Sequence, residues 1–467
     1  MTGIVAAVVL SAGFVADASG GRLTAGAPDR VFDAVSIDTR TLGPGSLFIA
    51  LRGDRFDGHA FIDAALQGGA TGLLVSTPPA NTGEAAVIVV PDTLRALQAL
   101  GHEVRRRSGA QVVAITGSTG KTTTKEVTAA FLAARYDVFR NRGNLNNHVG
   151  LPLSLLELRR GPDIAVVELG MNQPGEIRTL VSIAEPDVRV WTNVGDAHYG
   201  FFGSRDAIAR AKAEILELAG PETVLVANAD DALIRAHLNG FPGRRVLFGE
   251  RSDADVHVVS VRERGVDGTA VDVDTRAGRL VLDIALPGRG QVWNVLAATA
   301  VALEFGVVPS SIEARARTLA PVDRRGAVTL LPNGARLIDD SYNASPAAVQ
   351  MMLEALAATP AAGRRIAVLG EMLELGEWSR ALHETCGRVA AATHVDVLVA
   401  IGGDAADGLV AGALAGGLPA PAIDRFADSA SAAPYVAALV QPGDLVLVKG
   451  SRGTRTDLVA DRLREVA

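Results

Sequence analysis

A phosphate-binding loop is the strongest chemical feature of the sequence. An apolar run over residues 112–116 precedes Gly117-Ser118-Thr119-Gly120-Lys121-Thr122-Thr123, and helix-forming residues follow. A loop that opens onto a helix N-terminus presents unpaired N–H groups and a partial positive charge, and glycines let an anion approach the backbone. Lys121 suits the β- and γ-phosphates of a nucleotide, and the Thr122 hydroxyl suits Mg²⁺. Because Ile115 replaces the first glycine of the usual motif, a plain strand–turn–helix is the alternative interpretation.

Two side chains that follow predicted strands are candidates for the same chemistry. Glu168 lies in the predicted strand 164–169, where a carboxylate either binds Mg²⁺ or joins a salt bridge. His198 follows the predicted strand 188–192 in a glycine-containing loop. There it either binds a metal, shuttles a proton or is simply solvated.

Lys212 has an unusual position on its helix. The predicted helix spans residues 204–218, and Lys212 comes four residues after Ile208 and four before Leu216. Helical spacing therefore puts it near the apolar face. Such a lysine either extends its ammonium group to solvent or is chemically modified.

A group of asparagines precedes the segment Gly150-Leu151-Pro152. Amide side chains offer donors and acceptors to a polar ligand, but asparagine is also a common turn former. Both roles stay open for Asn141, Asn144, Asn146 and Asn147.

Three polar loops follow predicted strands near the C-terminus. Because the carboxyl ends of parallel strands gather at one edge of a sheet, we expect these loops to share a crevice. They are Asp339-Asp340-Ser341-Tyr342-Asn343, residues 370–376 and Lys449-Gly450-Ser451-Arg452.

Composition excludes several classes of protein. With 467 residues the chain needs more than one domain, and a net charge of −7 argues against binding nucleic acid through phosphate contacts. The basic run Arg105-Arg106-Arg107 is interpreted as the solvated end of a helix over residues 94–107, where cations suit the helix dipole. The single cysteine, Cys386, excludes an intramolecular disulfide and is interpreted as a small buried hydrophobe.

The sequence predicts a cytoplasmic protein. Residues 1–12 are apolar but lack the positive charge of a signal segment, so they are interpreted as the start of a folded domain. No other uncharged run reaches the length of a membrane span. We expect neither membrane insertion nor binding of nucleic acid.

Alternating strands and helices predict an α/β fold with three domains. The predicted domains span residues 1–107, 108–320 and 321–467. The central domain has a mostly parallel sheet, and period-two alternation over residues 256–286 predicts antiparallel hairpins that extend it. The third domain is predicted to be doubly wound and Rossmann-like, with a hinge near Pro321.

Together these motifs resemble the Mur ligase family over nearly the whole chain. The loop at residues 115–123 looks like the family's ATP loop, and the asparagine segment is similar to its substrate loop. The three C-terminal loops look specific to one member of the family. Asp38-Thr39-Arg40 and Asp57-Gly58-His59 resemble the module that holds a UDP-sugar. The implied fold is an N-terminal UDP-substrate module, a central P-loop ATPase and a C-terminal Rossmann-like domain.

The resemblance also implies an activity. It is closest to the member that joins D-alanyl-D-alanine to UDP-N-acetylmuramoyl-tripeptide (UDP-MurNAc-tripeptide), using ATP and an acyl phosphate, for peptidoglycan synthesis. The implied cofactors are ATP, two Mg²⁺ ions and a carbamylated Lys212, and the expected state is a monomer.

Residue roles follow from the same resemblance. It implies catalytic roles for Lys121, Glu168, His198 and Lys212, of which the last three hold Mg²⁺ together with Thr122. Asn294 matches an adenine contact, Arg325 an ATP contact and Asp340 a ribose contact. The implied substrate contacts are Thr39, Arg40, Asn144, Asn146, Asn147, Tyr342, Asn343, Lys449 and Arg452.

Three other functions fit parts of the pattern. The Mur ligase that adds the third peptide residue typically carries Asp-Asn-Pro-Arg, which this sequence lacks. A folylpolyglutamate synthetase would lack the N-terminal UDP-sugar module. A regulatory P-loop protein is the third alternative, although the Asn-Lys-x-Asp motif of GTPases is absent.

Overall fold

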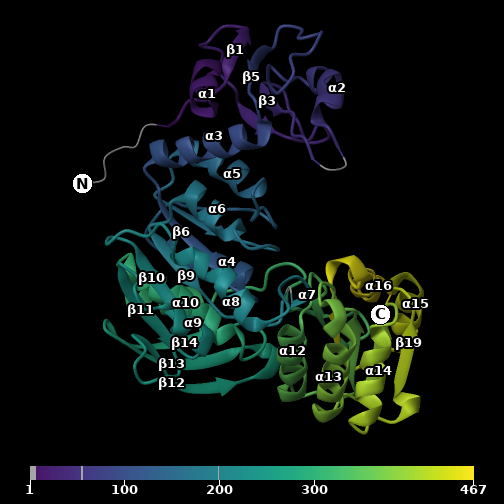
Figure 1. The fold of residues 1–467 in the computed structure, drawn as a ribbon. Helices are drawn as coiled ribbons and strands as arrows, with labels where there is room; N and C mark the ends of the chain where they lie inside the picture. Colours follow the sequence, from purple (N-terminus) through teal and green to yellow (C-terminus); the bar gives the residue numbers. More distant parts are fainter. Residues whose placement is uncertain (1–6, 54–55, 198, 467) are drawn as a thin grey trace. The chain divides into compact units, whose positions relative to one another are not determined.

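The computed structural model describes residues 7–53, 56–197 and 199–466 and contains three β-sheets (Figure 1). Its internal contacts divide the chain into two units, and each is described by itself. The first comprises residues 1–114 and 136–188, and the second comprises residues 115–135 and 189–467. Within the described ranges, no helix is long and apolar enough to cross a lipid bilayer.

The N-terminal sheet has five strands in the order β1-β5-β4-β3-β2. Strands β2 to β5 are parallel and β1 is antiparallel to β5. The strands are β1 (Arg22–Ala25), β2 (Ala34–Ser36), β3 (Ser46–Ile49), β4 (Gly72–Val75) and β5 (Ala86–Val89). The helices of this region are α1 (Ala12–Ser19), α2 (Ile62–Gln67) and α3 (Thr93–Ser108). Every residue of β3 and β4 is buried, as expected for apolar strands within a parallel sheet.

The prediction that Arg105 belongs to a solvated helix end is wrong. Arg105 is only 9% exposed, and its guanidinium donates hydrogen bonds to the carbonyl oxygens of Ala184 and Glu185 and to the carboxylate of Asp187. It thereby binds the C-terminal end of α6 (Glu176–Ala184) to α3. Sequence spacing did not reveal this role because the partners lie about 80 residues further along the chain. Arg106 and Arg107 are exposed, as expected.

The central sheet has nine strands in the order β14-β13-β12-β11-β10-β9-β6-β8-β7. They are β6 (Gln111–Thr116), β7 (Val138–Arg140), β8 (Ile164–Glu168), β9 (Val188–Trp191), β10 (Val224–Asn228), β11 (Arg244–Gly249), β12 (Val256–Glu263), β13 (Thr269–Thr275) and β14 (Gly278–Ile284). β10, β11 and β12 pair in parallel, whereas β13 pairs antiparallel with both β12 and β14. The predicted antiparallel extension is therefore confirmed.

The helices of this region connect its strands. They are α4 (Lys121–Leu132), α5 (Gly150–Leu155), α6, α7 (Tyr199–Phe202), α8 (Arg205–Ala213), α9 (Ala232–His237), α10 (Gln291–Glu304) and α11 (Pro309–Ala316). In the second unit α4 packs against α10. The predicted helix 204–218 is shorter than expected, since α8 ends at Ala213 and a 3₁₀ turn follows at Glu214–Leu216.

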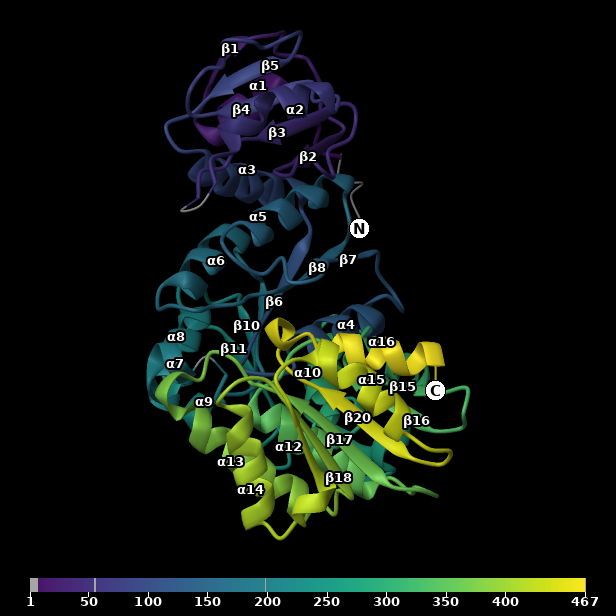
Figure 2. The same ribbon diagram turned by 90° about the vertical axis from the view of Figure 1, so that its right-hand side faces the viewer.

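The C-terminal sheet has the order β15-β16-β20-β17-β18-β19, and Figure 2 shows its strands side by side. The strands are β15 (Ala327–Leu330), β16 (Arg336–Asp340), β17 (Arg365–Gly370), β18 (Val397–Ile401), β19 (Ile423–Phe426) and β20 (Leu445–Lys449). All are parallel except β15, which pairs antiparallel with β16.

Helices cover both faces of this sheet, so the predicted doubly wound arrangement is confirmed. Alternate strand residues enter two separate cores, one with α12 (Pro346–Ala358), α13 (Ser379–Ala392) and α14 (Ala406–Ala415) and one with α15 (Ser429–Leu439) and α16 (Asp457–Val466). Cys386 lies in the first core, where burial raises the pKa of its thiol to about 12. It is the buried hydrophobe that the sequence predicted.

Candidate active site

The predicted phosphate-binding loop follows a buried strand and opens directly onto a helix. All residues of β6 after the first are buried, and α4 begins at Lys121. Gly120 has a φ of +78°, a left-handed conformation that favours glycine. A Cβ at this position would also lie 2.2 Å from Oδ1 of Asn294. Conformation and space therefore both require glycine here.

Asn193, two residues beyond β9, holds the loop in shape. Its Oδ1 accepts hydrogen bonds from the backbone N–H groups of Ser118 (3.1 Å) and Thr119 (2.9 Å), and its Nδ2 donates to the carbonyl of Thr119 (3.0 Å). In this structure the two loop amides are therefore bonded to an amide side chain of a neighbouring strand end. Sequence analysis did not single out Asn193, although its place after a predicted strand was a usable signal.

Two lysines converge on one carbonyl oxygen of the loop. Nζ of Lys121 donates to the carbonyl of Gly117 at 2.8 Å, and Nζ of Lys212 donates to the same oxygen at 2.9 Å. Lys212 is 1% exposed, so its predicted place on the apolar face is confirmed and the solvent-reaching alternative is wrong.

The first turns of α4 are tied to α10. Thr122 is 8% exposed, and the Thr124 hydroxyl donates to Oδ1 of Asn294 at 3.1 Å. Nδ2 of Asn294 in turn donates to the side chain of Gln291 at 2.8 Å. Asn294 therefore lies beside the loop, and its role as an adenine contact stays a prediction.

In the first unit, an asparagine orients the carboxylate of Glu168. Glu168 ends β8 and is 4% exposed, and Oε1 accepts a hydrogen bond from Nδ2 of Asn146 at 2.8 Å. Asn141 accepts from the backbone N–H of Glu168 at 3.1 Å. Asn147 instead accepts from the N–H groups of Val149 and Gly150, at the start of α5, so its side chain acts as a turn former. Asn144 is exposed.

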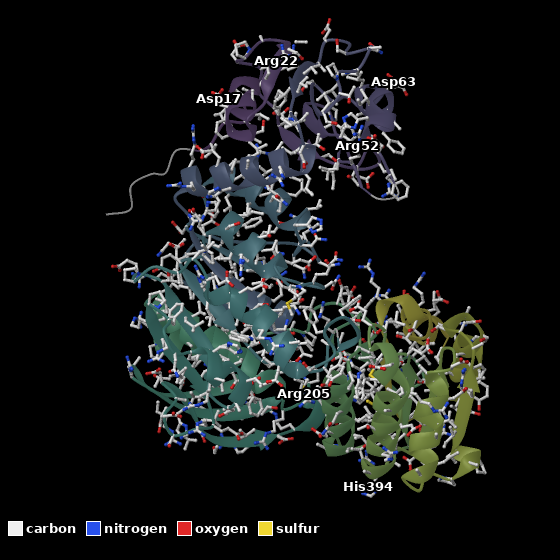
Figure 3. All side chains as sticks on the ribbon, in the orientation of Figure 1. Asp17, Arg22, Arg52, Asp63, Arg205 and His394 are labelled. Carbon is white, nitrogen blue, oxygen red and sulfur yellow. The ribbon has the colours of Figure 1, made fainter. Side chains whose placement is uncertain are left out.

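His198 lies outside the described residues, but its neighbour Asp196 is anchored. The Asp196 carboxylate accepts two hydrogen bonds from Arg205, at 2.6 and 2.7 Å, and is 9% exposed. Arg205, labelled in Figure 3, is the first residue of α8, the helix that carries Lys212. This bidentate pair raises the pKa of Arg205 and fixes the segment after β9 to that helix.

The C-terminal polar loops meet at one edge of their sheet, as predicted. β20 lies between β16 and β17, so the ends of these three parallel strands are adjacent. Lys449 is buried and forms an ion pair with Asp340, and its Nζ also donates to the carbonyl of Asn343 at 3.0 Å. Burial raises the pKa of Asp340, against the effect of the Lys449 charge.

The loop over residues 370–376 forms hydrogen bonds with Ser451 and with His383. Ser451 donates its backbone N–H to the carbonyl of Glu371 at 3.0 Å, and its hydroxyl accepts from the N–H of Leu373 at 2.9 Å. His383 of α13 accepts from the N–H of Met372 through Nε2 at 2.9 Å. Its Nδ1–H donates to the carbonyl of Ser379 at 2.7 Å, so His383 is held as the neutral imidazole.

This arrangement predicts an acid-sensitive contribution to stability. Burial lowers the pKa of His383, so the unfolded chain takes up a proton that the native protein does not. The contribution is fully present above pH 6.5, the ordinary value, and is lost as the pH falls below it. We expect the melting temperature of His383→Gln to change less than that of the native protein between pH 7.5 and 5.5. An equal change in melting temperature with pH for the variant and the native protein would contradict this assignment.

In the N-terminal sheet, the residues predicted to hold a UDP-sugar make local ion pairs. Arg40 is exposed and binds Asp38, whose pKa this contact lowers to about 2. His59 contacts Asp57 through Nδ1 (2.6 Å) and accepts from the N–H of Ser76 through Nε2 (2.9 Å). Arg52, labelled in Figure 3, also pairs with Asp57. Thr39 is half-buried.

Comparison with known proteins decides the family. Three family models match the chain: "Mur ligase family, catalytic domain" over residues 31–116, "Mur ligase middle domain" over residues 115–302, and "Mur ligase, glutamate ligase domain" over residues 324–452. The chain belongs to the Mur ligase family. A curated relative of this Mur ligase is UDP-N-acetylmuramoyl-tripeptide--D-alanyl-D-alanine ligase of Bacillus subtilis, 34% identical over 93% of this chain and 94% of the relative.

Solved structures agree with this family assignment. MurF from Acinetobacter baumannii superposes with a TM-score of 0.88 at 32% identity and covers 98% of this chain and 99% of its own. MurF ligase from Thermotoga maritima, solved in complex with ADP, has a TM-score of 0.80 at 31% identity and covers 92% and 97%. The three-domain Mur ligase fold expected from the sequence is confirmed.

Proposed function

We propose that this Mur ligase joins D-alanyl-D-alanine to UDP-MurNAc-tripeptide, converting ATP to ADP and phosphate and supplying UDP-MurNAc-pentapeptide for peptidoglycan synthesis. The observation that carries the proposal is the near-complete coverage of a 34% identical relative with that name. The ADP complex of the Thermotoga maritima neighbour supports the choice of nucleotide. The strand–loop–helix at residues 111–132 supports a phosphate site at this loop.

The chemistry requires activation of a carboxylate. A carboxylate oxygen of the tripeptide attacks the γ-phosphorus of ATP, ADP leaves, and an acyl phosphate forms. The amine of D-alanyl-D-alanine then attacks the carbonyl carbon and loses a proton, and the tetrahedral intermediate collapses to the amide with release of phosphate. Because two anions must meet in the first step, neutralising their charge is the main task of the protein.

Lys121 and the loop carry this task in the proposed mechanism. The partial positive charge at the start of α4 and the ammonium group of Lys121 act on the phosphates of ATP. Gly117, Ser118, Thr119, Gly120, Thr122 and Thr123 complete the predicted loop contacts. Asn193 fixes the shape of the loop through its hydrogen bonds to the backbone of Ser118 and Thr119.

We assign Lys212 a carbamate. The Nζ ammonium first loses a proton, the resulting amine attacks CO₂, and the adduct loses a second proton, so that a buried cation becomes an anion beside Lys121. The burial of Lys212 and its place beside Lys121 on the Gly117 carbonyl support this assignment. Carbamylated Lys212, Thr122, Glu168 and His198 would then hold two Mg²⁺ ions, whose bound charge would neutralise the reacting phosphates. The buried hydroxyl of Thr122 and the buried carboxylate of Glu168 are oxygen donors of the kind that Mg²⁺ prefers.

The remaining assignments place the UDP-sugar, ATP and the dipeptide in three regions of the chain. Residues 1–107 hold the UDP-sugar through Thr39 and Arg40, residues 108–320 hold ATP, and residues 321–467 complete the ATP and dipeptide sites. The proposed ATP contacts in these regions are Asn294, Arg325 and Asp340. The other proposed substrate contacts are Asn144, Asn146, Asn147, Tyr342, Asn343, Lys449 and Arg452. We also propose that the enzyme acts as a cytoplasmic monomer.

Mass spectrometry of reaction products tests the activity. The purified protein is incubated with ATP, D-alanyl-D-alanine and UDP-MurNAc-tripeptides that carry either diaminopimelate or lysine as the third residue. We expect one tripeptide to gain the mass of the dipeptide less one water, with one ADP formed per product. ATP hydrolysis that is independent of the dipeptide, or addition of a single amino acid, would refute the proposal.

A further inference from the structure

Arg189 carries a charged side chain in the interior of the central region. It is the second residue of β9, a strand whose residues are all buried, and it is only 2% exposed. Burial lowers the pKa of its guanidinium to about 10, so the group is still a cation at neutral pH. Within the part of the chain that the structure describes, no carboxylate oxygen lies within 4.0 Å of this cation. A buried charge without a carboxylate partner costs free energy unless other groups stabilise it.

The groups that stabilise this cation belong to the helix that carries Lys212. Nη1 of Arg189 donates to the carbonyl of Ile215 at 2.5 Å and also to the carbonyl of Glu217. The 3₁₀ turn Glu214–Leu216 follows α8 directly, so both acceptors lie at the C-terminal end of this helical segment. Carbonyl groups at a helix end lack partners within the helix and carry a partial negative charge. Arg189 satisfies two of them, and they stabilise its charge.

The end of α8 fixes the place of Lys212. Lys212 lies in the last turn of α8, three residues before Ile215, and its buried Nζ donates to the carbonyl of Gly117 at 2.9 Å. The opposite end of α8 is held separately, by the ion pair of Arg205 with Asp196. Helix ends fray when they are not held, and a displacement near 1 Å at a reacting centre typically costs about 10²-fold in rate. The contacts of Arg189 therefore bear on the site as well as on stability.

We propose that Arg189 is a positioning residue for the ligase reaction, which holds the end of α8 so that Lys212 stays at the phosphate-binding loop. This inference rests on the proposed function, in which Lys212 carries a carbamate. The alternative is that Arg189 only stabilises the fold. Its loss would then expose every buried side chain to the same degree, through global unfolding, whereas loss of a positioning residue releases the end of α8 locally.

Labelling of the lysines with acetic anhydride separates these two roles without any substrate. The four lysines of the chain give four labelling rates by peptide mass spectrometry, measured in bicarbonate-free buffer at low degrees of modification. Lys125 of α4 is as buried as Lys212, so it is the internal reference for global unfolding. The variants are Arg189→Met, which keeps a long apolar side chain, and Arg189→Lys, which keeps a cation with fewer donors.

Arg105→Met is the matched control. Arg105 is also a buried arginine that binds carbonyl groups at the end of a helix, in this case those of Ala184 and Glu185 after α6. None of the proposed ATP, Mg²⁺ or substrate contacts lies on α6. We expect Arg105→Met to lower the free energy of unfolding, to keep the native ratio of the Lys212 and Lys125 labelling rates, and to keep the native kcat.

We expect Arg189→Met to label Lys212 about 10-fold faster relative to Lys125 than the native protein does, because only the end of α8 is released. Its kcat should fall about 10- to 100-fold, while the KM values for ATP and the dipeptide stay within about twofold, since the displaced group acts in the transfer step. Arg189→Lys should lie between the native protein and Arg189→Met in both measurements, because it restores part of the contact.

Three results would overturn the inference. Equal acceleration of labelling at Lys212 and Lys125 would show that Arg189 only supports the fold, and if Arg189→Met does not fold, Arg189→Lys gives this comparison. Unchanged labelling of Lys212 in both variants would show that the end of α8 does not depend on Arg189. Faster labelling with native kcat would show that the position of Lys212 does not matter to the reaction. Failure of the proposed function differs from all three, because the native protein then forms no product.

Discussion

We expect Lys212→Ala to lower kcat by about 10²- to 10³-fold, the usual cost of losing one group that stabilises a charged transition state. The reason is that Lys212 lies beside Lys121, with both ammonium groups donating to the Gly117 carbonyl. A carbamate on Lys212 would balance the charge of Lys121 and add oxygen ligands for Mg²⁺. The measurement is the rate of ADP formation with saturating tripeptide and dipeptide.

A second variant separates a carbamate from an ammonium. Lys212→Arg keeps a positive charge but cannot be carbamylated, so it should be as impaired as Lys212→Ala. Short carboxylic acids should partly restore only the alanine variant, because they replace the missing anion in the space that the side chain left. Full activity of Lys212→Arg would contradict the carbamate. So would high activity of Lys212→Ala that short carboxylic acids do not increase.

The composition of the chain makes the carbamate easy to detect directly. The sequence contains only four lysines, Lys121, Lys125, Lys212 and Lys449, since arginine supplies the other positive charges. After exchange with ¹³C-bicarbonate, the native protein should give one carbamate carbon signal by NMR. That signal should be missing from Lys212→Arg. This measurement does not depend on activity.

Gly120→Ala should lower kcat/KM for ATP by about 10²-fold. Alanine costs roughly 1–2 kcal/mol in the left-handed conformation of Gly120. In addition its Cβ would meet Oδ1 of Asn294, which is 2.2 Å from that position and is held by Thr124. The loop must therefore shift, and a displacement near 1 Å at a reacting centre typically costs about 10²-fold in rate.

Gly175→Ala is a matched control for this variant. Gly175 also precedes a helix, α6, in a left-handed conformation with φ of +88°, but a Cβ there meets nothing within 4 Å. We expect it to share the backbone cost, measured as a lower free energy of unfolding, and to keep normal kinetics with ATP. Equal loss of activity in both variants would show that strain alone, and not displacement of the loop, explains the effect of Gly120→Ala.

Local sequence predicted the loop and the place of Lys212 because both depend on neighbours within a few positions. The order of apolar strand, glycine-containing turn and helix is a property of residues 112–134, and the apolar face of α8 follows from helical spacing. The antiparallel hairpins after β11 were equally predictable from alternation and turn residues. The family resemblance supplied roles that spacing had left open.

Other features depended on contacts between distant segments. Asn193 fixes a loop about 75 residues away, Arg105 binds Asp187, and His383 reaches Met372 from another element. No periodicity marks these residues, because their partners are set by how strands and helices pack. The hydrogen bonds that Asn146 and Asn141 make to the carboxylate and the backbone of Glu168 were likewise decided by packing.

The sequence by itself thus determined which segments form strands, turns and helices, and which residue types are available for phosphate chemistry. Only the tertiary structure decided which of those residues contact each other or bind the same carbonyl or carboxylate group. The physical reason is that backbone preference and hydrophobic spacing act over a few residues, whereas hydrogen bonds and ion pairs form between any groups that the packed core brings together.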